Sequence, residues 1–492
     1  MTTEDSVSLD ERSEAAVVVL GDVGRSPRIG YHAKMLADEG FLVKIIGFYD
    51  SVPGEHIMNH PRIKIVGIPA PPDFMDSFPA FVQLPLKLFW NFITLFLALA
   101  FKTSAFNLRV ILMQNPPALP TMIVCYMFSL IKCSKFTIDW HNYMFSILQN
   151  KYGLTEQQVF GKEKKSKKAQ IVRCVSILEG LCGKLAHYNL CVTDAMRRDL
   201  MDRWGIRATT FYDRPPTWKF KNTTIEQIHD LYLRLSLTDT VVRGTEVEST
   251  VLTHRTPTGS IELLSNRPIV LLSSTSWTPD EQFDILLDAL VSYDKFKALE
   301  PGLPKVLMII TGKGPLKAQY LEEICNKKLK NVDVFTPWLE ASDYPTILAS
   351  ADLGISMHAS TSGLDLPMKV VDMFGAKVPA LALKFPCIHE LVEEHVNGYL
   401  FTVPEELSNR IRDLSRGFPD NCTELNRLKK NTKEKQFESW EVMWHQIAAP
   451  SADFKLPDNG FSKLRATIQF SFIVIIAIMP IHLFMGTFSS LF

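Results

Sequence analysis

The chain has no net charge, few cysteines and no amino-terminal targeting sequence, and each absence excludes a class of protein. Its 53 basic residues balance 53 acidic residues, so it lacks the basic excess that is typical of nucleic-acid-binding proteins. Its 8 cysteines are irregularly spaced without a CxxC pair, which disfavours a disulfide framework and favours a reducing compartment. Residues 1–14 are polar and acidic, and we expect a tail there rather than a secretory signal.

The sequence also lacks a DxD triad, the carboxylate pattern by which one class of nucleotide-sugar enzymes holds a divalent metal ion. We identify no metal ligands and predict no tightly bound cofactor. The residues leave open whether a divalent metal is required.

The chain does have length, apolar residues and a regular alternation of strand and helix patterns. Its 492 residues, 46% of them hydrophobic, are enough for two or three domains that each bury a core. Short β-branched runs alternate with helical stretches in both halves, which predicts α/β domains with parallel sheets flanked by helices. The expected strands are Ala16–Leu20, Leu42–Phe48, Ile63–Ile68, Arg109–Gln114, Phe136–Trp140, Asn189–Thr193, Ile269–Ser273, Val306–Thr311, Val332–Thr336, Leu353–His358 and Pro379–Leu383.

These patterns divide the chain into two doubly wound, Rossmann-like domains. We expect an amino-terminal domain at 15–218 and a carboxyl-terminal domain at 268–449. The segment between them, 219–267, is polar, rich in threonine and without clear periodicity, and is therefore expected to be a linker.

Two apolar segments suggest contact with a membrane. Ala466–Phe488 is long enough to cross a hydrocarbon core of roughly 30 Å, and Lys463 and Arg465 before it put the body of the protein on the cytosolic side. The segment 78–101 is expected to be an interfacial helix, because a spanning one would separate strands of the same domain. A buried core helix is the alternative for this second segment.

Two features of the first half follow expected strands and point to a ligand site. A glycine-containing turn, Gly21–Arg28, opens a helix, and its amides and the helix amino-terminus could face an anion or a sugar. His141 follows another strand, together with Asp139, and a histidine at a strand end can act as a base because its ordinary pKa is near neutrality. Tight packing of the turn and a merely hydrogen-bonded histidine are the alternatives.

The second half contains two loops that are rich in small and hydroxylic residues. Ser274 and Ser276 follow the strand Ile269–Ser273, and Gly312 and Gly314 follow the next strand along the chain. Both loops open helices, whose backbone amides are suited to bind an anion.

A third loop of the second half leads into a helix that begins near Pro367. Lys369 lies in its first turn, and an ammonium beside backbone donors at a helix start suits a diphosphate. Asp372, three residues later, lies on the same face, where it would accept hydrogen bonds from ribose hydroxyls. An ordinary ion pair between Lys369 and Asp372 is the alternative.

These strings resemble a known family. The stretch Leu366-Pro-Met-Lys-Val-Val-Asp372, followed by Pro379, is similar to the donor-binding LPxKxxE…P element of glycosyltransferases with the GT-B fold, two facing Rossmann-like domains. The closest resemblance is to eukaryotic GDP-mannose-dependent β-mannosyltransferases of lipid-linked oligosaccharide assembly. It covers about Val17 to Trp444 and rests on Gly21–Arg28, Asp139–Asn142, Ser273–Thr278, Thr311–Pro315, Thr336–Glu340 and Ser362–Gly375.

The resemblance implies an inverting transfer of mannose from GDP-mannose to dolichol-diphosphate-linked N,N′-diacetylchitobiose, with formation of a β-1,4 linkage. It also implies the endoplasmic reticulum membrane as the location, with cytosolic catalytic domains and the carboxyl-terminal segment as a single-pass anchor. Later mannosyltransferases of the same pathway are the protein partners that it suggests, and no nucleic acid is involved.

The resemblance further implies roles for particular residues. The acceptor hydroxyl needs a base, for which His141 is the first choice and Asp139 the second. Asp365 would lie near the donor sugar. The remaining expected contacts are Lys369, Gly312 and Gly314 with the diphosphate, Ser274 and Ser276 with the donor, Asp372 with the ribose, and Gly24 and Arg25 with the acceptor.

Two other functions remain open at this point. One is a GT-B transferase with a different nucleotide sugar or lipid acceptor. The other is a catalytically silent membrane scaffold that keeps the fold, which the lysine, the aspartate and the glycine loops disfavour because a scaffold does not need them.

Overall fold

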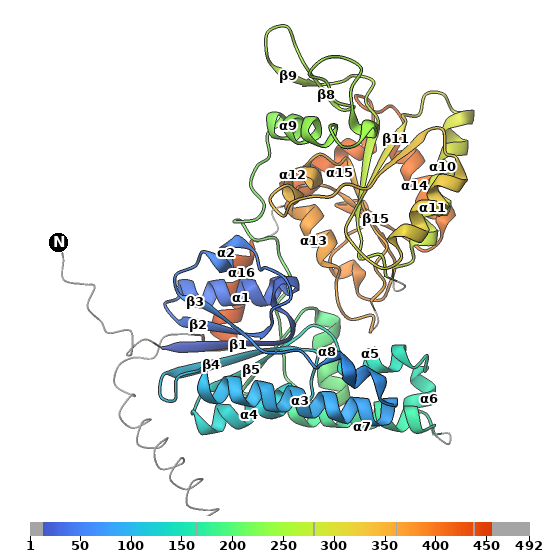
Figure 1. Cartoon of the computed structure of the whole chain (residues 1–492). Coiled ribbons are helices and arrows are strands. Elements are labelled where there is room, and N and C mark those ends of the chain that lie inside the picture. Colours follow the sequence, from blue (N-terminus) through green and yellow to red (C-terminus); the bar gives the residue numbers. More distant parts are fainter. Residues whose placement is uncertain (1–12, 163–165, 279–280, 361, 436–437, 455–492) are drawn as a thin grey trace, which may run out of the picture. The chain divides into compact units, whose positions relative to one another are not determined.

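The computed structural model describes residues 13–162, 166–278, 281–360, 362–435 and 438–454, which form two compact units (Figure 1). Unit 1 contains the residues up to Tyr212 and those from Glu441 onward, and unit 2 contains Asp213–Trp440. The expected membrane anchor at Ala466–Phe488 lies outside the described residues.

The described part of unit 1 contains a seven-stranded parallel sheet with the order β3-β2-β1-β4-β5-β6-β7. Its central strands are apolar on both faces, as expected for a parallel sheet covered by helices; Ala15 to Val18 are fully buried. The strands are β1 (Glu14–Asp22), β2 (Leu42–Phe48), β3 (Ile63–Gly67), β4 (Leu108–Asn115), β5 (Lys135–Trp140), β6 (Tyr188–Cys191) and β7 (Thr209–Thr210).

Helices cover both faces of this sheet. α1 lies on one side, and α3, α4 and α7 lie together on the other (Figure 1). The helices of unit 1 are η2 (Val23–Arg25), α1 (Pro27–Asp38), α2 (Glu55–Met58), η3 (Asp73–Ser77), α3 (Ala80–Phe101), α4 (Thr121–Ile131), α5 (Met144–Lys151), α6 (Glu156–Phe160), α7 (Lys167–Gly183), α8 (Asp194–Trp204), α16 (Trp440–Met443), η6 (Trp444–Ala448) and α17 (Ala449–Ser451).

Unit 2 is built around a six-stranded parallel sheet with the order β12-β11-β10-β13-β14-β15, and a short antiparallel pair, β8-β9, is separate from it among the described residues. Its strands are β8 (Thr253–Arg255), β9 (Ile261–Leu263), β10 (Ile269–Ser274), β11 (Val306–Thr311), β12 (Val332–Phe335), β13 (Leu353–Ser356), β14 (Ala380–Leu383) and β15 (Gly398–Phe401). Its helices are α9 (Ile225–Leu235), η4 (Thr240–Val242), α10 (Phe283–Leu299), α11 (Lys317–Lys327), α12 (Tyr344–Ala349), α13 (Met368–Gly375), η5 (Ile388–Glu390), α14 (Pro404–Ser415) and α15 (Thr423–Glu434).

The segment 219–267 differs from the linker expected there, because most of it is folded into unit 2. Thr224 begins α9 with a capping box in which its side chain and that of Gln227 bond to each other's backbone amides. The apolar face of α9 packs against α12, where the buried Tyr232 hydroxyl lies 2.9 Å from Ser350 Oγ. The threonine-rich composition therefore concealed an amphipathic helix.

The carboxyl end of the described chain also differs from the expected boundary at 449. Residues from Glu441 return to unit 1, where Trp444 is fully buried and its indole Nε1–H donates to His32 Nδ1 at 3.2 Å. Phe454 stacks on Trp444 with ring centroids 5.9 Å apart. These aromatic contacts explain why the segment belongs to the amino-terminal sheet rather than to the sheet that precedes it in sequence.

Candidate active site

The donor-side candidates lie at the carboxyl edge of the unit 2 sheet. β10 lies between β11 and β13 in the sheet. Ser274 ends β10 and Ser276 follows it, Gly312 and Gly314 follow β11, and Asp365 lies in the loop after β13. Lys369 and Asp372 lie on α13, which follows the third loop. The carboxyl edge of a parallel sheet is where ligands bind in open α/β folds.

The two glycines allow neighbouring loops to touch. Gly312 has a φ of +119°, and a Cβ there would collide with the carbonyl oxygen of Thr275. A Cβ at Gly314 would collide with the carbonyl oxygen of Ser276. Loop packing alone therefore requires glycine at both positions, and their approach to a diphosphate stays a prediction.

The Lys369 ammonium is held by a carboxylate from another helix start. It forms an ion pair with Glu281, which is 4% exposed, whereas the Lys369 side chain is 24% exposed. Glu281 also accepts hydrogen bonds from the Thr275 hydroxyl and from the Ser276 amide, the latter at 2.9 Å. Glu281 thus fixes the lysine and the serine loop relative to each other.

Asp372 is a nearly buried carboxylate that is paired with a residue far away in sequence. Lys219 Nζ lies 2.9 Å from Oδ1 and 3.0 Å from Oδ2. Burial raises the pKa of Asp372, while Lys219 and the Tyr344 hydroxyl act in the opposite direction. Lys369 and Asp372 therefore each have another partner, which argues against the ordinary i,i+3 pair.

The remaining donor-side candidates join this network at its edge. Ser274 Oγ lies 3.0 Å from the Tyr344 hydroxyl oxygen and accepts a hydrogen bond from Thr311 at 3.2 Å. Asp365 accepts from the hydroxyls of Ser360 and Ser362, and one of its oxygens lies 3.5 Å from His358 Nε2. His358 ends the strand pattern in sequence and was not among the predicted site residues.

In unit 1, Asp139 is the centre of a buried ionic cluster. Arg28 donates to both of its oxygens, at 2.7 and 2.9 Å, and Nε2 of His32 and of His141 lie 3.2 and 2.8 Å from Oδ2. Burial opposes ionisation of Asp139, but Arg28 and the two histidines outweigh it and hold its pKa well below the usual range. Asp139 is fully buried, so it is badly placed to take a proton from a substrate.

His141 is the member of this cluster that reaches the surface, with 21% of its side chain exposed. A neutral ring that donates Nε2–H to Asp139 keeps its lone pair on Nδ1. The pair therefore has the geometry of an oriented base, with the carboxylate behind the imidazole.

The acceptor-side turn combines a packing role with an exposed charge. A Cβ at Gly24 would collide with the backbone of Ser51, and Asp22 accepts hydrogen bonds from the amides of Gly24 and Ser51 at 3.2 and 3.1 Å. Arg25 is 83% exposed and its Nε lies 3.5 Å from Asp22 Oδ2. Gly24 is thus required for packing, and Arg25 is available to a ligand.

Sequence reasoning missed the buried partners of these groups. Arg28 was visible only as the end of the Gly21–Arg28 turn, and Lys219 only as the first residue of the supposed linker. Glu179 is another: it is fully buried and accepts from Asn115 at 2.8 Å and from the first amides of α5. Burial raises the pKa of Glu179 to about 7.

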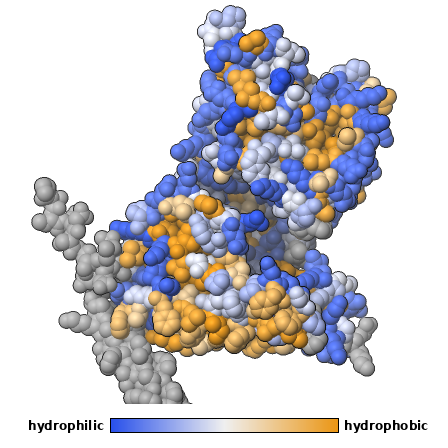
Figure 2. All heavy atoms as spheres, in the orientation of Figure 1, coloured by the Kyte–Doolittle hydropathy of each residue, from blue (hydrophilic) through white to orange (hydrophobic). Residues whose placement is uncertain are grey.

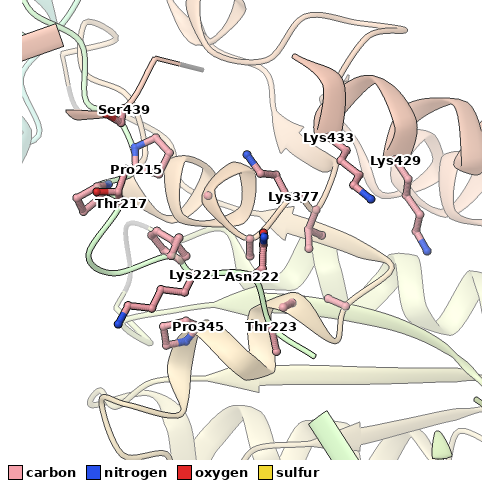
Figure 3. A pocket seen from close by; sticks show the side chains of 17 residues that line it. Pro215, Thr217, Lys221, Asn222, Thr223, Pro345, Lys377, Lys429, Lys433 and Ser439 are labelled. Carbon is pink, nitrogen blue, oxygen red and sulfur yellow. The ribbon is translucent and has the colours of Figure 1, made fainter. Parts of the chain in front are cut away.

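A basic pocket of about 590 Å³ lies at the amino ends of the strands of the unit 2 sheet (Figure 3). It lies beside the residues that precede β13 and β14, and Lys429 and Lys433 project into it from α15. Lys221 and Lys377 complete its positive rim, and its lining contains no aspartate or glutamate. Its position at the amino ends of the strands separates it from the donor-side loops.

Comparison with known proteins identifies the family. Residues 267–416 match the family described as glycosyl transferases group 1. The human and mouse proteins named chitobiosyldiphosphodolichol beta-mannosyltransferase are each 40% identical over 440 and 447 residues, covering 88% of this chain and 91% and 88% of theirs. The chain belongs to the chitobiosyldiphosphodolichol β-mannosyltransferase family. It is therefore a glycosyltransferase.

Another relative of this chain has a different kind of name. An Arabidopsis thaliana protein named UDP-glycosyltransferase TURAN is 39% identical over 471 residues, which is 90% of this chain and 97% of that protein. Among solved structures, Anabaena HepE in complex with UDP and glucose is 16% identical with a TM-score of 0.56, covering 89% of this chain and 99% of HepE. WaaG, a glycosyltransferase of lipopolysaccharide biosynthesis, is 12% identical with a TM-score of 0.57 over 89% and 99%. These structural likenesses confirm the expected GT-B fold.

Proposed function

We propose that this protein transfers mannose from GDP-mannose to dolichol-diphosphate-linked N,N′-diacetylchitobiose, forming a β-1,4 linkage with inversion at the anomeric carbon. The observation that carries the proposal is the 40% identity, over most of both chains, to mammalian proteins named for this acceptor and this linkage. The location proposed with it is the cytosolic face of the endoplasmic reticulum membrane, with Ala466–Phe488 as the anchor.

On the donor side, Lys369 neutralises the diphosphate and so stabilises GDP as it leaves. Glu281 holds the ammonium in the first turn of α13, where the positive end of the helix dipole also favours an anion. Ser274 and Ser276 contribute hydroxyl and backbone contacts to the same donor.

The nucleoside end of the donor meets Asp372, which accepts hydrogen bonds from the ribose hydroxyls. Burial raises the pKa of Asp372, and the ion pair with Lys219 opposes this by favouring the ionised carboxylate, which is the stronger acceptor. Asp365 lies near the sugar that is transferred.

On the acceptor side, His141 takes the proton of the attacking hydroxyl on Nδ1. The oxygen of that hydroxyl forms the new bond to C1 of mannose while the bond from C1 to the diphosphate oxygen breaks, and its electron pair leaves with GDP. Asp139 acts through His141: its carboxylate accepts Nε2–H and stabilises the imidazolium that forms. Asp139 is thus a positioning residue in place of the second-choice base.

The lipid diphosphate of the acceptor is assigned to Arg25. Its guanidinium is exposed and follows Gly24 in the turn after β1, at the carboxyl edge of the sheet that also bears His141. Guanidinium groups suit phosphate oxygens because they present paired donors. A requirement for a divalent metal would be additional to these contacts.

A second candidate, transfer from a UDP-sugar, is favoured by the printed name of the Arabidopsis relative. The test is to supply the purified full chain and the chitobiosyl lipid with GDP-mannose, UDP-glucose or UDP-N-acetylglucosamine in separate reactions. The proposal expects product with GDP-mannose alone. Product from a UDP-sugar at a comparable rate would replace GDP-mannose as the donor, and no product from any donor would favour the scaffold.

A further inference from the structure

Both ends of α3 are attached to the same sheet, which determines how this apolar helix can meet a membrane. Within the described residues, Val82–Phe101 is the helix that is long and apolar enough to cross a bilayer. However, β3 before it and β4 after it belong to one sheet, and Leu95 and Leu99 on α3 are fully buried. A helix that crossed a bilayer would pull these strands apart, so α3 lies along the surface of unit 1.

The outer side of α3 carries large apolar side chains at every fourth position. Phe89, Ile93, Leu97 and Phe101 are 66%, 38%, 47% and 78% exposed. Residues four apart on a helix share one face, so these side chains form a continuous stripe that faces away from the sheet.

The same surface continues over two more helices. α4 packs against both α3 and α7, and on it Ile123 and Leu130, two turns apart, are exposed. On α7 the exposed Ile171, Leu178 and Leu181 again share one helix face. Figure 2 shows apolar side chains gathered along this side of unit 1, where Figure 1 places α3, α4 and α7.

A buried lysine connects two helices of this surface. Lys132, directly after α4, donates to the carbonyl oxygens of Leu99 and Thr103 at 2.7 and 3.0 Å and to the Thr103 hydroxyl at 2.6 Å. It therefore satisfies carbonyl groups at the carboxyl end of α3 and ties this end to α4.

The exposed charges on the three helices are basic, whereas η3 before α3 contributes Asp76, which pairs with Lys87 of α3. α3, α4 and α7 contain a single acidic residue, Glu179, and it is fully buried. Exposed basic residues lie on α7 or directly after α3 and α7, namely Lys102, Lys167, Lys168, Arg173 and Lys184. Apolar side chains with basic residues on the same helices and at their ends match a bilayer whose headgroups carry negative charge, because each such residue adds roughly 1 kcal/mol of attraction near the surface.

We propose that α3, α4 and α7 form one docking face that inserts shallowly into an anionic phospholipid bilayer. A single interfacial helix, as the sequence predicts, is thereby extended to three. The face would hold unit 1 at the depth of the headgroups, where the diphosphate of the proposed acceptor lies. The inference rests on the proposed function only for this use of the contact.

Other occupants of the face fit its charges less well. A second copy would bring the same basic side chains against each other, and like charges repel. The apolar segment Ala466–Phe488 of this chain has no acidic residue to pair with them. A bilayer with anionic lipids can contact both the apolar stripes and the basic side chains.

Two native cysteines offer a matched pair of probes. Cys174 is exposed on α7 and shares a helix face with Ile171 and Leu181, whereas Cys325 is exposed on α11 of unit 2. The full chain, with Cys133 and either Cys325 or Cys174 replaced by serine, is labelled with a polarity-sensitive fluorophore. It is reconstituted into vesicles of phosphatidylcholine with a minority of phosphatidylserine, with and without doxyl-labelled lipid that quenches on contact.

The proposal expects quenching by doxyl lipid to be several-fold stronger at Cys174 than at Cys325. Adding Leu97→Asp and Leu181→Asp should abolish most of that difference, while the control Leu299→Asp, at a position 80% exposed in unit 2, should not. Thermal unfolding of each variant verifies that the fold is retained. Because quenching needs no substrate, it can succeed when the transfer assay fails, and the reverse.

Equal quenching at the two positions would overturn the proposal. A bifunctional maleimide identifies the other occupants. Cross-linking of Cys174 to Val474→Cys within one chain would assign the face to the carboxyl-terminal segment, and cross-linking of Cys174 between two chains would assign it to a second copy. Either result would also reject the docking of this face on lipid.

Discussion

Lys219 and Asp372 are 153 positions apart in sequence, yet the Lys219 ammonium lies within 3.0 Å of both Asp372 oxygens. The ammonium also lies 5.3 Å from the centre of the Tyr344 ring. A buried carboxylate without a counterion would favour its protonated form. The charge of the proposed ribose contact therefore depends on a lysine near the beginning of unit 2.

Replacing Lys219 with methionine should weaken donor binding. Asp372 would lose its counterion, and removing one partner of a buried ion pair costs about 3–5 kcal/mol. We expect the KM for GDP-mannose to rise at least about 10-fold. This corresponds to less free energy than the full cost of an unpaired charge, because Asp372 can take up a proton and become neutral. Lys219→Arg should restore most of the affinity. The matched control is Lys221→Met, in the basic pocket at the other sheet edge, and equal KM values for both methionine variants would contradict the assignment.

Replacing Lys369 with alanine should lower turnover strongly without unfolding unit 2. The variant removes one positive charge from the leaving diphosphate, and losing a comparable preorganised group costs roughly 10²–10³ in rate. Lys369→Arg keeps the charge and should lose much less. The measurement is initial rate at low and at saturating GDP-mannose, and near wild-type rates for Lys369→Ala under both conditions would end the assignment.

Replacing His141 with alanine should lower kcat by about 10²–10⁴ with little change in the KM for GDP-mannose. The side chain is partly exposed, so thermal stability should stay close to that of the wild type. Asp139→Asn should also lower kcat but should destabilise unit 1, because it leaves the buried Arg28 without its carboxylate. If His141→Ala instead weakens GDP binding and keeps normal turnover, the histidine contacts the donor and the base lies elsewhere.

Glu179 should make the stability of unit 1 depend on pH. Its pKa is raised by burial from its ordinary value to about 7, so the stability it contributes is present below the unfolded value and is lost as the pH rises through 7. Between about pH 6 and about pH 8 this loss is about 1 kcal/mol, or a few degrees in Tm. Glu179→Gln removes the titrating group, so its Tm should fall less over the same interval. An equal fall in both proteins would show that Glu179 does not titrate there.

Much of the fold could be predicted because parallel strands are continuous apolar runs. Leu42–Phe48 and Val306–Thr311 have the same bounds in the structure as in the sequence analysis, and the GT-B architecture is confirmed. The short strands β7, β8, β9 and β15 were missed, since two to four residues carry too little periodicity. α9 was missed because its polar face and threonine cap resemble a linker, although Thr224 and Gln227 form a recognisable capping box.

The sequence indicated where the candidate site residues lie, but not which side chains they contact. Strand ends and glycine loops in the sequence indicated the carboxyl ends of the parallel strands as the site, and Lys369, Asp372 and His141 lie there. Their partners come from distant segments: Glu281 is 88 positions from Lys369, and Arg28 is 111 positions from Asp139. Only the folded chain brings such residues together, and this is why the sequence did not reveal that Asp139, the second-choice base, is buried behind His141.

Analysis of the product linkage tests the central claim most directly. The purified full chain is incubated with GDP-mannose and dolichol-diphosphate-linked N,N′-diacetylchitobiose, and the released trisaccharide is digested with linkage-specific mannosidases and sequenced. The account predicts one mannose in a β-1,4 linkage to the distal sugar, removed by β-mannosidase and resistant to α-mannosidase, with one GDP formed per mannose transferred. An α-linked product, or no transfer to this acceptor, would contradict it.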